Sequence, residues 1–143
     1  MNRHQDIADC QNCLCLASRS AARAITAAFD RQLRPHGIRA TQFTLLTSLM
    51  LMGETSITVL AEFLGMDRTT LTRNVALLDT NGWVKTRTGD KDGRAHIVSV
   101  TGAGEKIVHK ALPAWRAAQA DVAQAIGPAG VAAMHRLART EIS

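Results

Sequence analysis

The chain has 143 residues, of which 46% are hydrophobic and 3% aromatic, and its formal net charge is +5. This length fits one domain with a sizeable core, and the charge suits an anionic partner. No stretch approaches the roughly 20 apolar residues of a membrane helix, and the N-terminus lacks the apolar core of a signal peptide. We therefore expect a cytoplasmic protein without membrane contact.

The first predicted element is a helix between about Asp9 and Pro35, which Pro35-His36-Gly37 ends. Small and apolar side chains recur on one side of it. A second helix is expected at 41–52. Three cysteines crowd the start of the first helix, a pattern that fits a reducing compartment better than a disulfide framework; they are Cys10, Cys13 and Cys15.

Two short helices joined by a tight turn are predicted between Thr58 and Thr80. Thr58 is the expected N-cap of the first helix, and Gly65 supplies the backbone freedom that the turn needs. Asp67 is the expected cap of the second helix. The buried side of that helix is marked by apolar residues at i, i+4 and i+7, namely Leu71, Val75 and Leu78.

The opposite side of the second helix is polar. At about 100° per residue, the side chains that point away from the apolar stripe are Thr69, Thr72, Arg73 and Thr80, and Thr70 faces outward in the first turn. Threonine can meet phosphates or bases, and arginine can bond bidentately to guanine. Such a face is also compatible with an ordinary solvated helix.

A basic hairpin follows the second helix. Asn81-Gly82 ends the helix, residues 83–87 and 94–100 are predicted strands, and 88–93 is a turn-rich loop. Lys91 and Arg94 would lie at or beside the tip, where an arginine can enter a narrow minor groove. The acids Asp90 and Asp92 either orient Arg94 or Arg73 through ion pairs or make the loop a solvated turn. This order of elements is typical of a winged helix-turn-helix.

The segment 41–100 is electrically neutral by count. It holds six cations, Arg68, Arg73, Lys85, Arg87, Lys91 and Arg94, against six acids, Glu54, Glu62, Asp67, Asp79, Asp90 and Asp92. The basic excess lies in the flanks. DNA binding is therefore inferred from the placement of charge and not from its sum.

The C-terminal part predicts two more helices. Thr101 can cap a long one, and Gly127-Pro128 separates it from a shorter one. Apolar residues recur at near-heptad spacing in the long helix, at Ile107, Ala111, Trp115, Ala118 and Val122. The shorter helix carries Val131, Met134, Leu137 and Ala138 on its apolar side.

Both ends are thus alanine-rich helices without a covering layer. Two protomers could pair through them and present two recognition helices to successive major grooves, about 34 to 36 Å apart. Packing of the same stripes within one chain is the alternative. We expect a mainly α fold with a small β wing, in which 41–100 form the DNA-binding lobe and 9–37 and 101–143 the dimerisation helices.

Three segments carry a resemblance to a known family. The segments Met66-Asp67-Arg68-Thr69-Thr70-Leu71-Thr72-Arg73-Asn74, Asp90-Lys91-Asp92-Gly93-Arg94 and Val100-Thr101-Gly102-Ala103-Gly104 resemble the MarR family of bacterial regulators. The resemblance runs from about Asp9 to Ile142 and implies one domain over 1–143. It implies a homodimeric repressor or activator that binds pseudo-palindromic double-stranded DNA and is released by a small molecule or an oxidant.

The resemblance also assigns roles by position. Thr70, Thr72 and Arg73 would read the groove, and Arg94 would enter the minor groove. Arg68 and Thr69 would lie where the helix enters the groove, and Lys91 would meet phosphate. No catalytic order of nucleophile, base and orienting group can be placed, so an enzyme is not expected. A winged helix used only for protein contacts would carry an apolar outer face, and this one is polar.

The sensing chemistry has three alternatives. Cys15 resembles the reactive cysteine of the organic-peroxide sensors in this family, although those hold the thiolate with tyrosines and this chain has none. Cys10 and Cys13 are weak metal-ligand candidates, because no Cys or His pair follows at zinc spacing; no cofactor is expected. A small aromatic effector is the third alternative, in a pocket whose walls could include Phe43, Met50, Met52 and Trp115.

Overall fold

The computed structural model describes residues 7–89 and 96–142. The N-terminal arm begins with a 3-10 helix, η1 (Asp9–Asn12), followed by α2 (Leu14–Leu33) and a second 3-10 helix, η2 (Arg34–His36). Gly37, at a φ of 81°, ends the arm as predicted. The expected single helix is therefore divided at Cys13, whose extended backbone separates η1 from α2.

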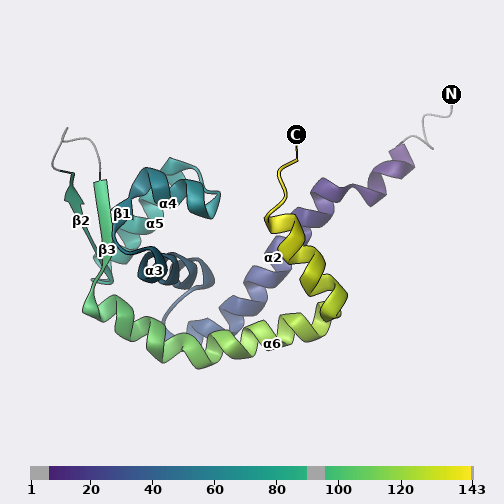
Figure 1. The fold of residues 1–143 in the computed structure, drawn as a ribbon. Helices are drawn as coiled ribbons and strands as arrows, with labels where there is room; N and C mark the ends of the chain where they lie inside the picture. Colours follow the sequence, from purple (N-terminus) through teal and green to yellow (C-terminus); the bar gives the residue numbers. More distant parts are fainter. Residues whose placement is uncertain (1–6, 90–95, 143) are drawn as a thin grey trace.

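A compact lobe follows the arm (Figure 1). It contains α3 (Ala40–Met52), β1 (Thr55–Ser56), α4 (Ile57–Leu64), α5 (Arg68–Thr80), β2 (Val84–Thr88) and β3 (His96–Val100). The three strands form an antiparallel sheet in the order β1-β3-β2. Val98 of β3 pairs with Thr55 on one side and with Thr86 on the other.

The first helix of the helix-turn-helix begins earlier than predicted. Its N-cap is Ser56, whose hydroxyl oxygen accepts a hydrogen bond from the backbone N–H of Val59 at 3.2 Å, and not Thr58. The difference arises from β1, which the sequence analysis did not predict. Because Thr55 and Ser56 are held extended by β3, the helix begins directly after them.

The long C-terminal helix is α6 (Gly102–Ala138), capped by Thr101, whose hydroxyl oxygen accepts from the backbone N–H of Gly104 at 3.1 Å. Both the cap and the predicted break are confirmed, since Gly127 has non-helical angles of φ 71° and ψ 171°. Beyond this break α6 turns back beside α2 (Figure 1). None of the described helices combines the length and the apolar character of a membrane-spanning segment.

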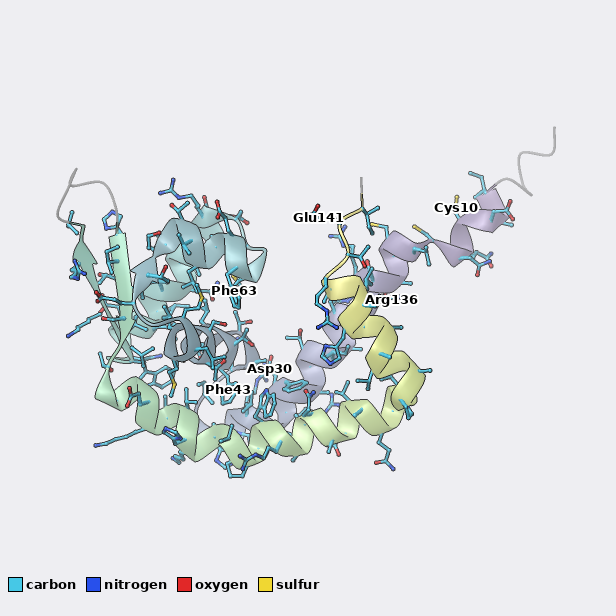
Figure 2. The ribbon with its side chains drawn as sticks, in the orientation of Figure 1. Cys10, Asp30, Phe43, Phe63, Arg136 and Glu141 are labelled. Atoms are coloured by element: carbon cyan, nitrogen blue, oxygen red, sulfur yellow. The ribbon has the colours of Figure 1, made fainter. Side chains whose placement is uncertain are left out.

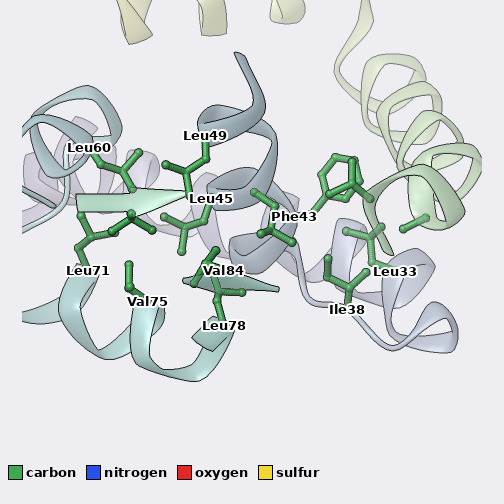
Figure 3. Packing of buried hydrophobic residues seen from close by; sticks show 14 of the residues in the cluster. Leu33, Ile38, Phe43, Leu45, Leu49, Leu60, Leu71, Val75, Leu78 and Val84 are labelled. Carbon is green, nitrogen blue, oxygen red and sulfur yellow. The ribbon is translucent and has the colours of Figure 1, made fainter. Parts of the chain in front are cut away.

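The core is centred between α3, α5 and the sheet, and it continues through Leu33 of α2 and through Val108, Ala111 and Ala114 of α6 (Figure 3). The predicted buried stripe of α5 is confirmed, because Leu71, Val75 and Leu78 all belong to this cluster. The arm and the end of α6 contribute little to this core. Leu33 is the only described residue of α2 in the buried class, and no described residue of α6 after Ala118 belongs to it. The lobe and the first half of α6 therefore share one core, whereas most of α2 and the rest of α6 stay outside the buried class.

Candidate nucleic-acid interface

The start of α5 is fixed by Asp67, as predicted. Its carboxylate accepts from the backbone N–H of Thr70 at 2.9 Å and from the Thr70 hydroxyl at 2.8 Å. These bonds, the backbone one above all, hold the pKa of the Asp67 carboxyl below its ordinary value of 3.8. An ionised carboxylate at a helix N-terminus is also favoured by the helix dipole. The Thr70 hydroxyl is consequently occupied by the cap.

The outer face of α5 is exposed at every position that the helical period predicted, namely Thr69, Thr72, Arg73 and Thr80. Thr69, Arg73 and Thr80 lie nearly opposite the buried stripe. Thr72 lies on the flank next to the sheet. Together with Arg68 it lines a cleft of about 310 Å³ whose other wall includes Thr86 of β2 and His96 of β3.

The two arginines of α5 are available to an external anion. Neither the Arg68 nor the Arg73 side chain makes an ion pair or hydrogen bond with any described residue, and both are exposed. Their guanidinium groups present forked N–H donors that match phosphate oxygens or the edge of guanine. This arrangement provides two cations about 1.4 helical turns apart, of which Arg68 lies beside the hairpin strands.

Two of the six acids in this lobe are already engaged. Glu54 forms an ion pair with Arg87, and Asp67 caps α5. The Glu54–Arg87 pair takes one charge of each sign, so the lobe stays neutral by count, and it is the placement of the arginines on α5 that favours an anion. On that face the cations have no partner within the described part of the chain, while these two acids are held by groups of the lobe itself.

The hairpin is confirmed, with its first strand beginning at Val84 instead of Trp83. The β2–β3 ladder runs from the pair Val84 and Val100 to the pair Thr88 and His96. The proposed tip residues Lys91 and Arg94, and the acids Asp90 and Asp92, lie outside the described residues. The two described strands lie side by side at the edge of the lobe (Figure 1).

Thr101 joins the base of the hairpin to the end of α5 and the start of α6. Its hydroxyl donates to the Gly82 carbonyl at 2.6 Å, and its backbone N–H donates to the Trp83 carbonyl at 3.0 Å. Gly104 is buried against the same Trp83 carbonyl, where a side chain would collide. The end of α5, the wing and the start of α6 thus form one junction.

The three cysteines are exposed and form no disulfide. Cys10 lies at the outer end of the arm, far from the lobe (Figure 2). Cys15 is the second residue of α2, and no described residue donates a hydrogen bond to its thiol. The nearby Ser18 hydroxyl donates to the Cys15 carbonyl at 2.8 Å. No group of three or more possible metal ligands occurs within 7–89 and 96–142.

A small cavity of about 230 Å³ lies between α2, α3 and α6. Phe43 and Trp115 line it, as the sequence analysis suggested, and their rings stack with centroids 6.1 Å apart and planes 16° apart. Met50 and Met52 do not line it. Met50 packs against the lobe core, and Met52 lies exposed at the end of α3. The cavity is otherwise apolar, apart from two threonines.

Comparison with known proteins gives concordant results. A sequence model described as MarR family matches residues 36–95. An uncharacterized HTH-type transcriptional regulator of Bacillus subtilis, YwoH, is 33% identical over 86 residues, which cover 60% of this chain and 62% of that regulator. The match therefore spans less than two thirds of the length of YwoH.

Solved structures match over a larger part of the chain. The transcriptional regulator MosR of M. tuberculosis, crystallised in complex with DNA, is 36% identical with a TM-score of 0.78, covering 88% of this chain and 93% of MosR. A cysteine-to-serine mutant of E. coli MarR, complexed with operator DNA, has a TM-score of 0.77 at 22% identity, covering 88% of this chain and 91% of that one. The second likeness is one of fold alone.

Proposed function

The chain belongs to the MarR family of winged helix-turn-helix transcriptional regulators, and we propose that it is a dimeric repressor that reads a pseudo-palindromic operator with α5 and the wing. The observation that carries this proposal is the exposed polar face of α5, from which Arg68 and Arg73 extend without a partner among the described residues. The DNA complex of the 36% identical MosR supports it.

Four polar residues of α5 have distinct roles in this proposal. Arg73, near the centre of the outer face, bonds to a guanine edge in the major groove, and Arg68 meets phosphate where the helix enters the groove. Thr69 donates its hydroxyl to phosphate. Thr70 stabilises the start of the helix through Asp67 and contacts the groove with its methyl group. On the wing, Lys91 meets phosphate and Arg94 enters the minor groove.

Dimerisation would use the two ends of the chain. A groove of about 780 Å³ runs between the start of α2 and the end of α6, lined by apolar side chains that include Leu14, Ala17, Leu137 and Ile142. Leu14 is 85% exposed and Ile142 is 82% exposed. Exposed apolar surface of this kind is a mark of protein interfaces. A second copy of the chain would cover it and set two α5 helices on one face of the DNA.

Release from DNA has two candidate triggers. The cavity beside Phe43 and Trp115 lies where the arm meets the lobe, so a small aromatic ligand there would change the angle between them. Alternatively an oxidant acts on Cys15, which lines the groove proposed for dimerisation. An oxygen added to that sulfur would place a polar group on an apolar surface.

Changing Cys15→Ser would then abolish release of the DNA by organic peroxide, without weakening DNA binding by the reduced protein. Cys10→Ser would leave this release intact.

The experiment that tests the proposed function is a fluorescence-anisotropy titration of the DNA upstream of the protein's own gene. A scrambled duplex of equal length is the control. We expect tighter binding to the natural sequence, weakening steeply between about 50 and about 200 mM salt. Equal binding to both duplexes would contradict the proposal and favour a winged helix that contacts other proteins.

A further inference from the structure

The Thr72 hydroxyl donates a hydrogen bond within α5. Its Oγ1 lies 2.7 Å from the backbone carbonyl oxygen of Arg68, one turn earlier in α5. A carbonyl oxygen can only accept, so the single hydroxyl proton must point into the helix. The side that Thr72 presents to the outside therefore consists of oxygen lone pairs and a methyl group.

Most other hydroxyl groups of α5 are committed in the same way. Thr70 donates to Asp67 Oδ2 at 2.8 Å, and Thr80 donates to the Ala76 carbonyl at 3.0 Å. Thr69 differs, since its hydroxyl makes no hydrogen bond within the described part of the chain. The donors on the outer face thus come from Arg68, Arg73 and Thr69, and Thr72 contributes an acceptor.

The position of Thr72 decides what this acceptor can meet. It is exposed in the N-terminal half of α5, one residue before Arg73 and on the flank that faces the cleft beside β2 and β3. The first residues of a recognition helix are the ones that reach base edges. In the major groove, adenine N6 and cytosine N4 are the hydrogen-bond donors, whereas guanine presents only acceptors and thymine an acceptor and a methyl group. Phosphate oxygens also only accept. To bond to any of these acceptors, Thr72 would have to release the Arg68 carbonyl.

We propose that the Thr72 hydroxyl, already placed among the groove-reading residues by the resemblance to the MarR family, accepts a hydrogen bond from an exocyclic amino group, adenine N6 or cytosine N4, beside the guanine read by Arg73. This inference rests on the proposed function, because it assumes that α5 lies in the major groove. It adds the chemical class of the base edge that this position selects.

Two substitutions separate the hydroxyl from the methyl group of Thr72. Thr72→Val keeps the shape and the methyl group but removes the acceptor, while Thr72→Ser keeps the acceptor and removes the methyl group. Thr80→Val is the matched control, because it deletes a hydroxyl with the same internal bond near the C-terminal end of α5. Each variant would be titrated against an operator set in which every base pair is replaced in turn.

We expect Thr72→Val to reduce the preference at one base pair per half-site by about 3- to 10-fold, the range of one neutral hydrogen bond. Thr72→Ser and Thr80→Val should preserve that preference. The decisive step replaces the selected adenine or cytosine by an analogue that lacks the amino group. Wild-type protein should lose the same factor on this analogue, and Thr72→Val should lose nothing further.

This coupling between side chain and base is not produced by a general weakening of the helix. If wild type binds its operator specifically but Thr72→Val and the analogue act independently, the inference about Thr72 is wrong and the proposed function stands. If wild type shows no sequence preference at all, both are overturned.

Discussion

Arg87 of β2 is ion-paired with Glu54 in the turn before β1, with its Nη2 2.9 Å from Oε1 of the carboxylate. Because β3 lies between the two outer strands, the Arg87 side chain spans the width of the sheet. The pair therefore ties the outer strand of the wing to the segment that leads into α4. The ion pair also engages Arg87, which is one of the cations of the proposed DNA-binding lobe.

Glu54→Gln should strengthen DNA binding with little effect on folding. Both side chains are about half exposed, at 52% and 54%, so the free energy of unfolding should change by less than about 1 kcal/mol. The freed Arg87 should add about one phosphate contact, which steepens the dependence of log K on log salt by about 0.9. Glu62→Gln, on α4, removes an equal charge without freeing an arginine. Equal slopes for the two variants would contradict this role of Arg87.

Gly104→Ala should destabilise the junction of α5, wing and α6. A Cβ at this position would collide with the Trp83 carbonyl oxygen and lie 2.8 Å from Val100 Cγ1. Overpacking of this kind costs about 1 to 3 kcal/mol. At Gly102 no described atom lies within 4 Å of such a Cβ, so Gly102→Ala should be neutral or slightly stabilising. Urea unfolding of the two variants measures the difference, and similar midpoints would count against tight packing at Gly104.

Asp67 should make part of the stability depend on pH. Its pKa is lowered in the folded protein, so its contribution is complete above the ordinary value of 3.8 and is lost as the pH falls through the lower folded value. Asp67→Asn keeps a capping oxygen but cannot titrate. The stability advantage of wild type over this variant should therefore shrink as the pH falls from about 5 to about 2. A difference that stays constant over this range would exclude the ionised cap.

Leu137→Glu should give a monomer with a folded lobe. Leu137 is 51% exposed and lines the groove proposed for dimerisation, and a carboxylate there could not be buried by a second copy without a large desolvation cost. Leu51→Glu is the control, because Leu51 is 86% exposed on α3, outside that groove. Sedimentation equilibrium reports the mass, and circular dichroism the helix content. Identical masses for both variants and wild type would place the interface elsewhere.

The sequence predicted those features that depend on near neighbours. Asp67 as a cap, Gly127 as a break and the buried side of α5 are all written in residues a few positions apart, and all are confirmed. The predicted start of α4 was wrong, because Ser56 and Thr58 are both good N-cap residues. The choice between them is made by pairing with β3, a strand that comes much later in the chain.

The candidate site was predictable to a similar extent. Helical periodicity placed Thr69, Thr72 and Arg73 on an exposed face, which the structure confirms. It could not show that the Thr72 proton is bonded to the Arg68 carbonyl, since this depends on a side-chain rotamer. Nor could it show that Glu54 and Arg87 meet across the sheet, because that contact depends on strand order.

If α5 reads DNA sequence, the strongest effect on discrimination should come from Arg73. Wild type, Arg73→Ala and Arg116→Ala would each be titrated against the operator and its scrambled counterpart; Arg116 is an exposed arginine of α6, remote from α5. Arg73→Ala should lose about 1 to 3 kcal/mol of the preference for operator, while Arg116→Ala should keep it. An Arg73→Ala protein that still distinguishes the two duplexes as wild type does would contradict this role of α5.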